Sequence, residues 1–187
     1  MTGERADGGR RPGAPLPRWP IRVVDVSASG VHVRRRSLTR DDLAIFAAFL
    51  GVDAMTAFDL DVHVKPFRGD GLAVTGKVSA TVMQTCVVTL EPMVNTIAEE
   101  VEASFRPEEK LKVHLVHDEE DGLAIDASVA ADDPLVGGVI DVAAVAAEFL
   151  ALGVDHYPRK PDADFQPPEE GGEASPFAGL SKLKRDT

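Results

Sequence analysis

Apolar and polar residues alternate along several stretches of the chain, and a period of two is typical of β-strands with one buried face. Within residues 56–67, Phe58, Leu60, Val62 and Val64 fall on one side, which predicts that this side faces the core. The glycine-rich turn Gly69-Asp70-Gly71 predicts a hairpin. The predicted strands are residues 21–26, 31–37, 56–67, 72–85, 94–105 and 111–116, although Ala98-Glu99-Glu100 suits a helix equally well.

Two other stretches carry apolar residues at helical spacing. The first follows Thr39, a good N-cap residue, and stops at Gly51. The second follows Asp141, which has the chemistry of a catalytic carboxylate but is better explained as an N-cap, and it ends at Gly153. The apolar face of this second helix is formed by Val142, Val145, Ala146, Phe149 and Leu150.

This order of elements predicts an α+β domain in which two amphipathic helices pack on a mostly antiparallel β-sheet or a partly open barrel. We place the domain at residues 19–157. Residues 1–18 are rich in Gly, Pro and Arg and predict a disordered basic tail. Residues 158–187 predict a second tail, rich in Pro and acidic residues, with an apolar and basic segment at its end.

Charge is distributed unevenly along the chain. Residues 1–40 carry a net charge of +6, residues 41–187 carry −17, and the total is −11. Because affinity for phosphate comes mainly from Lys and Arg, the acidic part is unsuited to general nucleic-acid binding. Alternation places His32, Arg34 and Arg36 on one strand face, which makes this basic stripe the best candidate for RNA contact. The alternative is a strand edge that charge keeps soluble.

Features of catalytic or metal sites are scarce. The sequence lacks a phosphate-binding Gly-Lys-Ser or Gly-Lys-Thr and a Gly-x-Ser-x-Gly elbow. His114 and His117 would point to opposite faces of a strand, so we expect no metal site there. Cys86 is the one cysteine, and without a visible base it is better explained as a half-buried structural residue than as a nucleophile. We therefore predict no enzymatic activity, no cofactor and no small-molecule substrate.

The ends of the chain also bear on location and partners. No stretch is long and apolar enough for a signal peptide or a membrane span, and a single cysteine gives no sign of an oxidising compartment, so we expect a cytoplasmic protein that does not bind membranes. Near the C-terminus, Phe177, Leu180 and Leu183 recur at helical spacing beside basic residues. They predict a segment that docks on a partner or on the domain itself.

Three ordered segments resemble the YceD family, the large ribosomal RNA subunit accumulation proteins, over roughly residues 20–185. They are residues 76–92, which end in Leu-Glu-Pro, residues 138–152, and residues 155–161 followed by 176–180. The closing segments resemble the alphaproteobacterial branch. Many members have Cys-x-x-Cys before Leu-Glu-Pro, whereas this chain has Thr89 at the second cysteine, so a metal or redox role does not transfer. The family-motif positions are Cys86, Leu90, Glu91, Pro92, Gly138, Ile140, Asp141, Tyr157, Pro158 and Arg159.

The resemblance implies a non-catalytic factor in ribosome biogenesis that supports 23S rRNA accumulation and assembly of the large subunit. The acidic character favours a ribosomal protein or an assembly intermediate as the partner, because ribosomal proteins are strongly cationic. The alternative is a direct rRNA-binding module that uses the Arg-rich N-terminal region.

Overall fold

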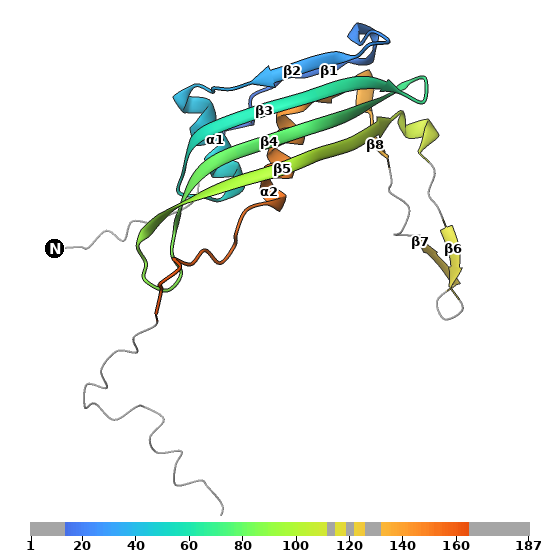
Figure 1. Cartoon of the computed structure of the whole chain (residues 1–187). Helices are drawn as coiled ribbons and strands as arrows, with labels where there is room; N and C mark the ends of the chain where they lie inside the picture. Colours follow the sequence, from blue (N-terminus) through green and yellow to red (C-terminus); the bar gives the residue numbers. More distant parts are fainter. Residues whose placement is uncertain (1–13, 112–114, 119–121, 126–131, 165–187) are drawn as a thin grey trace, which may run out of the picture.

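A computed structural model of the chain describes residues 14–111, 115–118, 122–125 and 132–164 (Figure 1). The helices are α1 (Arg40–Leu50) and α2 (Val142–Leu152). The strands are β1 (Pro20–Arg22), β2 (Val31–Arg35), β3 (Ala54–Phe67), β4 (Gly71–Thr85), β5 (Pro92–Arg106), β6 (Leu115–Asp118), β7 (Gly122–Ile125), β8 (Asp133–Pro134) and β9 (Val139–Asp141). Short 3-10 turns occupy Val23–Asp25, Glu108–Lys110 and Val136–Gly138.

The main sheet has five strands in the order β2-β3-β4-β5-β8. All neighbours are antiparallel except β5 and β8, which pair in parallel over two residues. Figure 1 shows α1 and α2 on the same face of this sheet, which is open rather than closed into a barrel. The predicted α+β class with a mostly antiparallel sheet and two helices is therefore confirmed.

Most predicted strands are present, with bounds close to those expected. The strand from residue 94 is extended throughout, because β5 pairs with β4 from Pro92 to Phe105, and this excludes the helical alternative at 98–100. The prediction for 21–26 was wrong beyond Arg22. There β1 pairs with β9 over three residues only, and the chain then turns through Val23–Asp25, where Arg22 and Asp25 form an ion pair at 2.8 Å.

The region after β5 also differs from the prediction. Residues 112–114 lie outside the described part, and β6 begins at Leu115 rather than at Leu111. The predicted strand stops at residue 116, but His117 and Asp118 also belong to β6, which pairs with β7. Alternation alone could not show this pairing, since β7 has only four residues.

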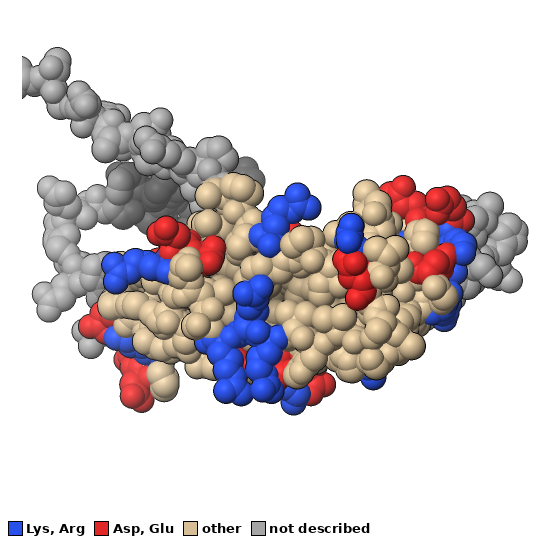
Figure 2. All heavy atoms as spheres, turned by 90° about the horizontal axis from the view of Figure 1, so that it is seen from above, with Lys and Arg blue, Asp and Glu red and all other residues tan. Residues whose placement is uncertain are grey.

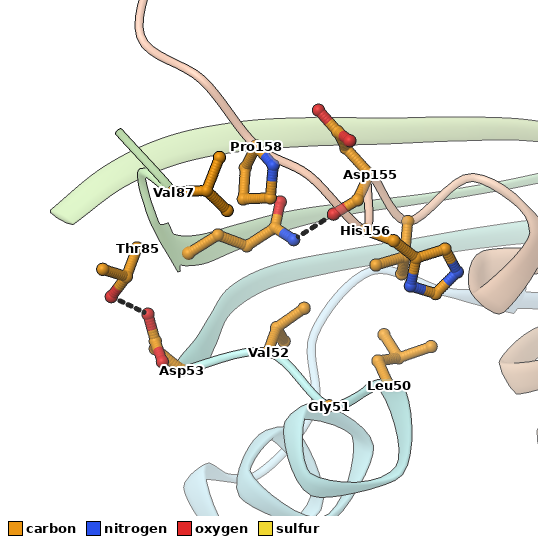
Figure 3. A pocket seen from close by; sticks show the side chains of 11 residues that line it. Leu50, Gly51, Val52, Asp53, Thr85, Val87, Asp155, His156 and Pro158 are labelled. Atoms are coloured by element: carbon orange, nitrogen blue, oxygen red, sulfur yellow. Dashed lines mark hydrogen bonds between the residues drawn. The ribbon is translucent and has the colours of Figure 1, made fainter. Parts of the chain in front are cut away.

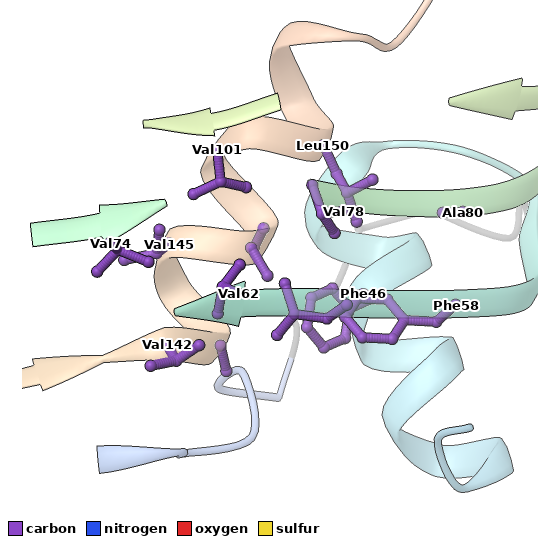
Figure 4. Packing of buried hydrophobic residues seen from close by; sticks show 14 of the residues in the cluster. Phe46, Phe58, Val62, Val74, Val78, Ala80, Val101, Val142, Val145 and Leu150 are labelled. Carbon is purple, nitrogen blue, oxygen red and sulfur yellow. The ribbon is translucent and has the colours of Figure 1, made fainter. Parts of the chain in front are cut away.

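The core lies between the inner face of the sheet and the two helices. Phe58, Leu60, Val62 and Val64 of β3 are all buried, as alternation predicts. Trp19, from the N-terminal segment, lies 6.0 Å from Phe46 of α1 and 5.8 Å from Phe58 between ring centroids. Figure 4 shows side chains of α1, α2 and the central strands meeting in this layer.

Both helices begin at the predicted caps. The Thr39 hydroxyl accepts a hydrogen bond from the Asp42 backbone N–H at 3.1 Å, and Gly51 ends α1 in the left-handed region at φ 70°. The Asp141 carboxylate accepts the Ala143 N–H at 3.1 Å and also the Trp19 N–H at 2.9 Å. Asp141 therefore ties the N-terminal segment to the start of α2. No helix of the described residues has the length and apolar character to cross a membrane.

Candidate functional site

The turn between β4 and β5 and the segment after α2 meet at one end of the sheet. We call residues 86–91 and 155–160 together the Cys86 corner. Two backbone hydrogen bonds of 2.9 Å close the turn, from the Cys86 N–H to the Glu91 carbonyl and from the Leu90 N–H to the Cys86 carbonyl. The corner thus joins two of the family-motif segments, which lie some seventy residues apart in the chain.

The segment after α2 is held to the turn by both backbone and side-chain contacts. The Val87 N–H donates to the Pro158 carbonyl at 2.9 Å, and the Lys160 ammonium forms an ion pair with Glu91 at 2.6 Å. Pro158 is buried. The predicted domain boundary at residue 157 stays a prediction, although Pro158 and Lys160 both contact the turn.

Cys86 lies inside the corner. Its side chain is 0% exposed rather than half-buried as predicted, because the following turn and Lys160 close over it. The sulfur accepts the backbone N–H groups of Thr89 and Lys160, each at 3.5 Å. Hydrogen bonding from Thr89, first through its side chain, and from the Lys160 backbone lowers the pKa of the thiol to about 6. The sulfur thus acts as a hydrogen-bond acceptor that joins the two halves of the corner.

A buried glutamine below the turn extends this network. Gln84 occupies an inward position of β4, where Val78, Ala80 and Val82 precede it. Its amide donates to the Asp155 carbonyl at 2.7 Å and accepts from the Asn95 side chain at 2.7 Å. Sequence reasoning overlooked Gln84. The signal was a polar residue in an otherwise apolar series, which requires partners when it is buried.

Several large apolar side chains are exposed on the corner, among polar ones such as Glu91 and Arg159. Leu90 is 77% exposed, and two other residues of the corner, Val87 and Tyr157, are also exposed. Leu90 also has a φ of 57°, a left-handed conformation that costs a residue other than glycine about 1–2 kcal/mol. Backbone strain of this kind clusters at ligand-binding and switch regions.

A pocket of about 260 Å³ lies beneath the corner. Figure 3 shows it where the end of α1 faces the segment after α2. Its walls combine apolar groups, such as Val52 and Pro158, with Asp53, Thr85 and His156. The Thr85 hydroxyl donates to Asp53 at 2.9 Å. In the described part of the chain, His, Cys, Asp and Glu do not form a group of three that could hold a metal ion. His114, the first member of the pair considered earlier, lies outside that part.

His32 and Arg34 lie on one face of β2, as alternation predicts, but Arg36 lies just past the end of β2 at Arg35, because the pairing with β3 stops there. Each of the three basic side chains has an acidic neighbour on β3. His32 and Arg34 both contact the Asp61 carboxylate, with the Arg34 Nε at 2.7 Å, and Arg36 lies 3.9 Å from Asp59. His32 and then Arg34 hold the pKa of Asp61 below its usual range. Figure 2 shows basic and acidic groups interspersed on the face it displays, with one larger basic group at its lower centre.

The remaining family-motif positions have different surroundings. Gly138, Ile140 and Asp141 lie near the start of α2, where Ile140 is buried and Asp141 caps the helix, so the structure does not bring them to the Cys86 corner. Arg159 lies within the corner segment. The predicted docking residues Phe177, Leu180 and Leu183 lie outside the described residues.

These features define an α+β domain with an open sheet and a corner that hydrogen bonds and an ion pair hold closed. Residues 74–184 match the family described as "Large ribosomal RNA subunit accumulation protein YceD", and the chain belongs to that family. No curated protein and no solved structure matches the chain. The matched range begins within β4, so it includes the whole Cys86 corner and excludes the basic stripe on β2, which the resemblance over residues 20–185 had included.

The acceptor role of Cys86 predicts how its variants behave. Cys86→Ser keeps an acceptor and should retain the fold and the function, although not the pH dependence of stability that the thiol adds. Cys86→Val fills similar space, accepts no hydrogen bond and should loosen the corner. Because the thiol pKa is lower in the folded chain, its stabilising contribution is present above pH 9.0 and is lost as pH falls towards about 6. Urea unfolding should therefore show the difference between natural protein and Cys86→Ser widening from pH 6 to pH 9. A loss of function in a folded Cys86→Ser protein would contradict this prediction.

Proposed function

We propose that the protein is a non-catalytic assembly factor in the cytoplasm that supports 23S rRNA accumulation by binding a ribosomal protein or an assembly intermediate of the large subunit. The observation that carries the proposal is membership in the large ribosomal RNA subunit accumulation family, over a range that contains the Cys86 corner. The corner offers contact groups rather than a reacting group, since its one thiol is buried.

Charge supports a protein partner over naked RNA. The chain carries a net charge of −11, and the cations of the stripe are paired with Asp59 and Asp61. A surface of this kind attracts a cationic protein and repels phosphate.

The function is tested by deleting the gene and measuring ribosomal particles. We expect a lower 23S to 16S ratio and fewer large than small subunits on sucrose gradients, with both values restored by the intact gene. A tagged full-length chain should then capture its partner whether or not RNase is present. Unchanged 23S to 16S ratios at low and normal growth temperature would contradict the proposal.

A second candidate is direct binding of rRNA through His32, Arg34 and Arg36. The position of His32 and Arg34 on β2, an edge strand of the sheet, with Arg36 directly after it, favours this candidate. Binding through several arginines weakens steeply as salt is raised. Capture that disappears with RNase and follows this salt dependence would favour RNA contact over protein contact.

A further inference from the structure

The outer edge of β5 is largely without a strand partner. On one side β5 pairs with β4 over its full length, and on the other side β8 pairs with it only at Phe105 and Arg106. Among the described residues, no strand lies beyond β5 from Pro92 to Ser104, and Figure 1 shows this stretch along the lower border of the sheet. Such an edge exposes N–H and C=O groups at alternate residues, which is the template on which an extended chain can pair.

The side chains along this edge are acidic. Residues 92–105 contain Glu99, Glu100 and Glu102 and no Lys or Arg. Glu100 lies 3.4 Å from Lys77 of β4 in a pair that is mostly exposed. In the described part of the chain, Glu99 and Glu102 have no cation within ion-pair distance. The edge therefore carries a net negative charge that a partner could neutralise.

A hollow of about 660 Å³ lies where the free edge meets β8. Three acidic residues, Glu102, Asp132 and Asp133, line it together with one cation, Arg68, and the rings of Phe67 and Phe149. The Arg68 guanidinium lies over the Phe67 ring, 5.0 Å from its centroid. Asp132 contacts Arg106 at 3.7 Å and Ser104 at 2.5 Å, while Asp133 has no described cation within ion-pair distance. Burial and then repulsion from Asp133 raise the pKa of nearby Glu148, as expected where negative charge is in excess. The space and charge suit the long apolar stem and cationic end of Lys or Arg.

The other end of the free edge reaches the Cys86 corner. β5 begins at Pro92, directly after the turn. Val94, four residues after the exposed Leu90, has an exposed side chain on the face of the sheet that the helices do not cover. An extended segment along β5 would thus meet apolar groups at one end and the acidic hollow at the other.

We propose that an extended segment of a protein partner, rich in Lys and Arg, pairs with the edge of β5 between Pro92 and Ser104 and places a cationic side chain in the hollow beside Glu102 and Asp133. This deepens the function proposed above and rests on it, since it states the chemistry of the partner. RNA does not fit, because its phosphates would face the glutamates. A second copy of this chain does not fit either, because two β5 edges would bring like charges together.

The probe is a blocked ten-residue peptide of alternating Lys and Val, added to the full chain. We expect saturable binding, with slowed hydrogen exchange at alternate backbone amides of β5. A peptide of the same sequence, N-methylated at alternate residues, has the same charge and lacks the donors that pair with an edge. It should bind poorly, as should the peptide with Glu in place of Lys. Equal binding of the N-methylated peptide, or no added protection along β5, would overturn the proposal.

Charge reversal in the hollow provides the second measurement. Glu102→Lys should weaken binding of the Lys-Val peptide by about tenfold, because it both removes an attraction and adds a repulsion at this exposed position. Glu109→Lys makes the same charge change in the 3-10 turn after β5 and should leave binding unchanged. If both variants weakened peptide binding equally, the effect would come from the net charge of the protein, and the assignment of the cationic side chain to the hollow would be overturned. The 23S to 16S ratio of the deletion strain does not depend on these peptides, so failure here and failure of the proposed function are distinguishable.

Discussion

Phe46→Ala is expected to lower the free energy of unfolding by about 3–5 kcal/mol, a large share of the stability of a domain of this size. Phe46 is 0% exposed, and its ring packs against Trp19 and Phe58, with ring centroids 6.0 and 5.3 Å away. Removing it leaves a cavity where α1, the N-terminal segment and β3 meet. Urea unfolding followed by circular dichroism measures the change.

Phe49→Ala is the matched control for this prediction. It makes the same chemical change on the same helix, three residues along, at a side chain that is 50% exposed. We expect a loss of less than about 1.5 kcal/mol, because little apolar area leaves a buried environment. Equal losses in the two variants would show that α1 does not pack in the way described.

Gly76→Ala is expected to destabilise the sheet by about 3–5 kcal/mol, the sum of overpacking and backbone strain. Gly76 lies in the middle of β4 with a φ of 153°, and a Cβ there would lie 2.2 Å from the Asp61 carbonyl oxygen and 2.6 Å from the Val62 Cα. Both atoms belong to the backbone of β3, which is held between β2 and β4 and cannot easily move. Thermal unfolding of the purified variant would show a large fall in Tm, or little soluble protein.

Gly69→Ala separates strain from collision. Gly69, in the β3–β4 turn, also has a positive φ of 93°, but a Cβ there would have no atom within 4 Å. It should cost about 1–2 kcal/mol, the strain of a left-handed residue alone. If Gly76→Ala lowered the free energy of unfolding no more than Gly69→Ala does, the close approach of the β3 backbone to Gly76 would be contradicted.

The Cys86 corner and the edge of β5 together form the surface on which we expect the partner to bind. β5 runs from the corner to the acidic hollow, so its edge joins the exposed apolar side chains of the corner to a negatively charged site. A partner with an extended cationic segment would contact all three. The hydrogen bonds of Cys86 and Gln84 stabilise this surface, and the exposed side chains of Leu90 and Glu102 are available to contact the partner.

Much of the architecture could be predicted because it depends on local chemistry. Thr39 and Asp141 cap the helices, and Gly51 and Gly153 end them, through hydrogen bonds and backbone conformations that need only neighbouring residues. The buried face of β3 follows from alternation, which requires no knowledge of the partner strands.

The sequence by itself determined the fold class, the helix ends, the hairpin at residues 69–71 and the segments that indicate the family. The tertiary structure decided which distant residues meet. It ended β1 at Arg22 because β9 is short, paired the basic stripe with Asp59 and Asp61 of β3, and brought Lys160 to Cys86 and Glu91. It also left the edge of β5 without a partner. These outcomes depend on strand order and register, which join residues far apart in the chain and which no local pattern encodes.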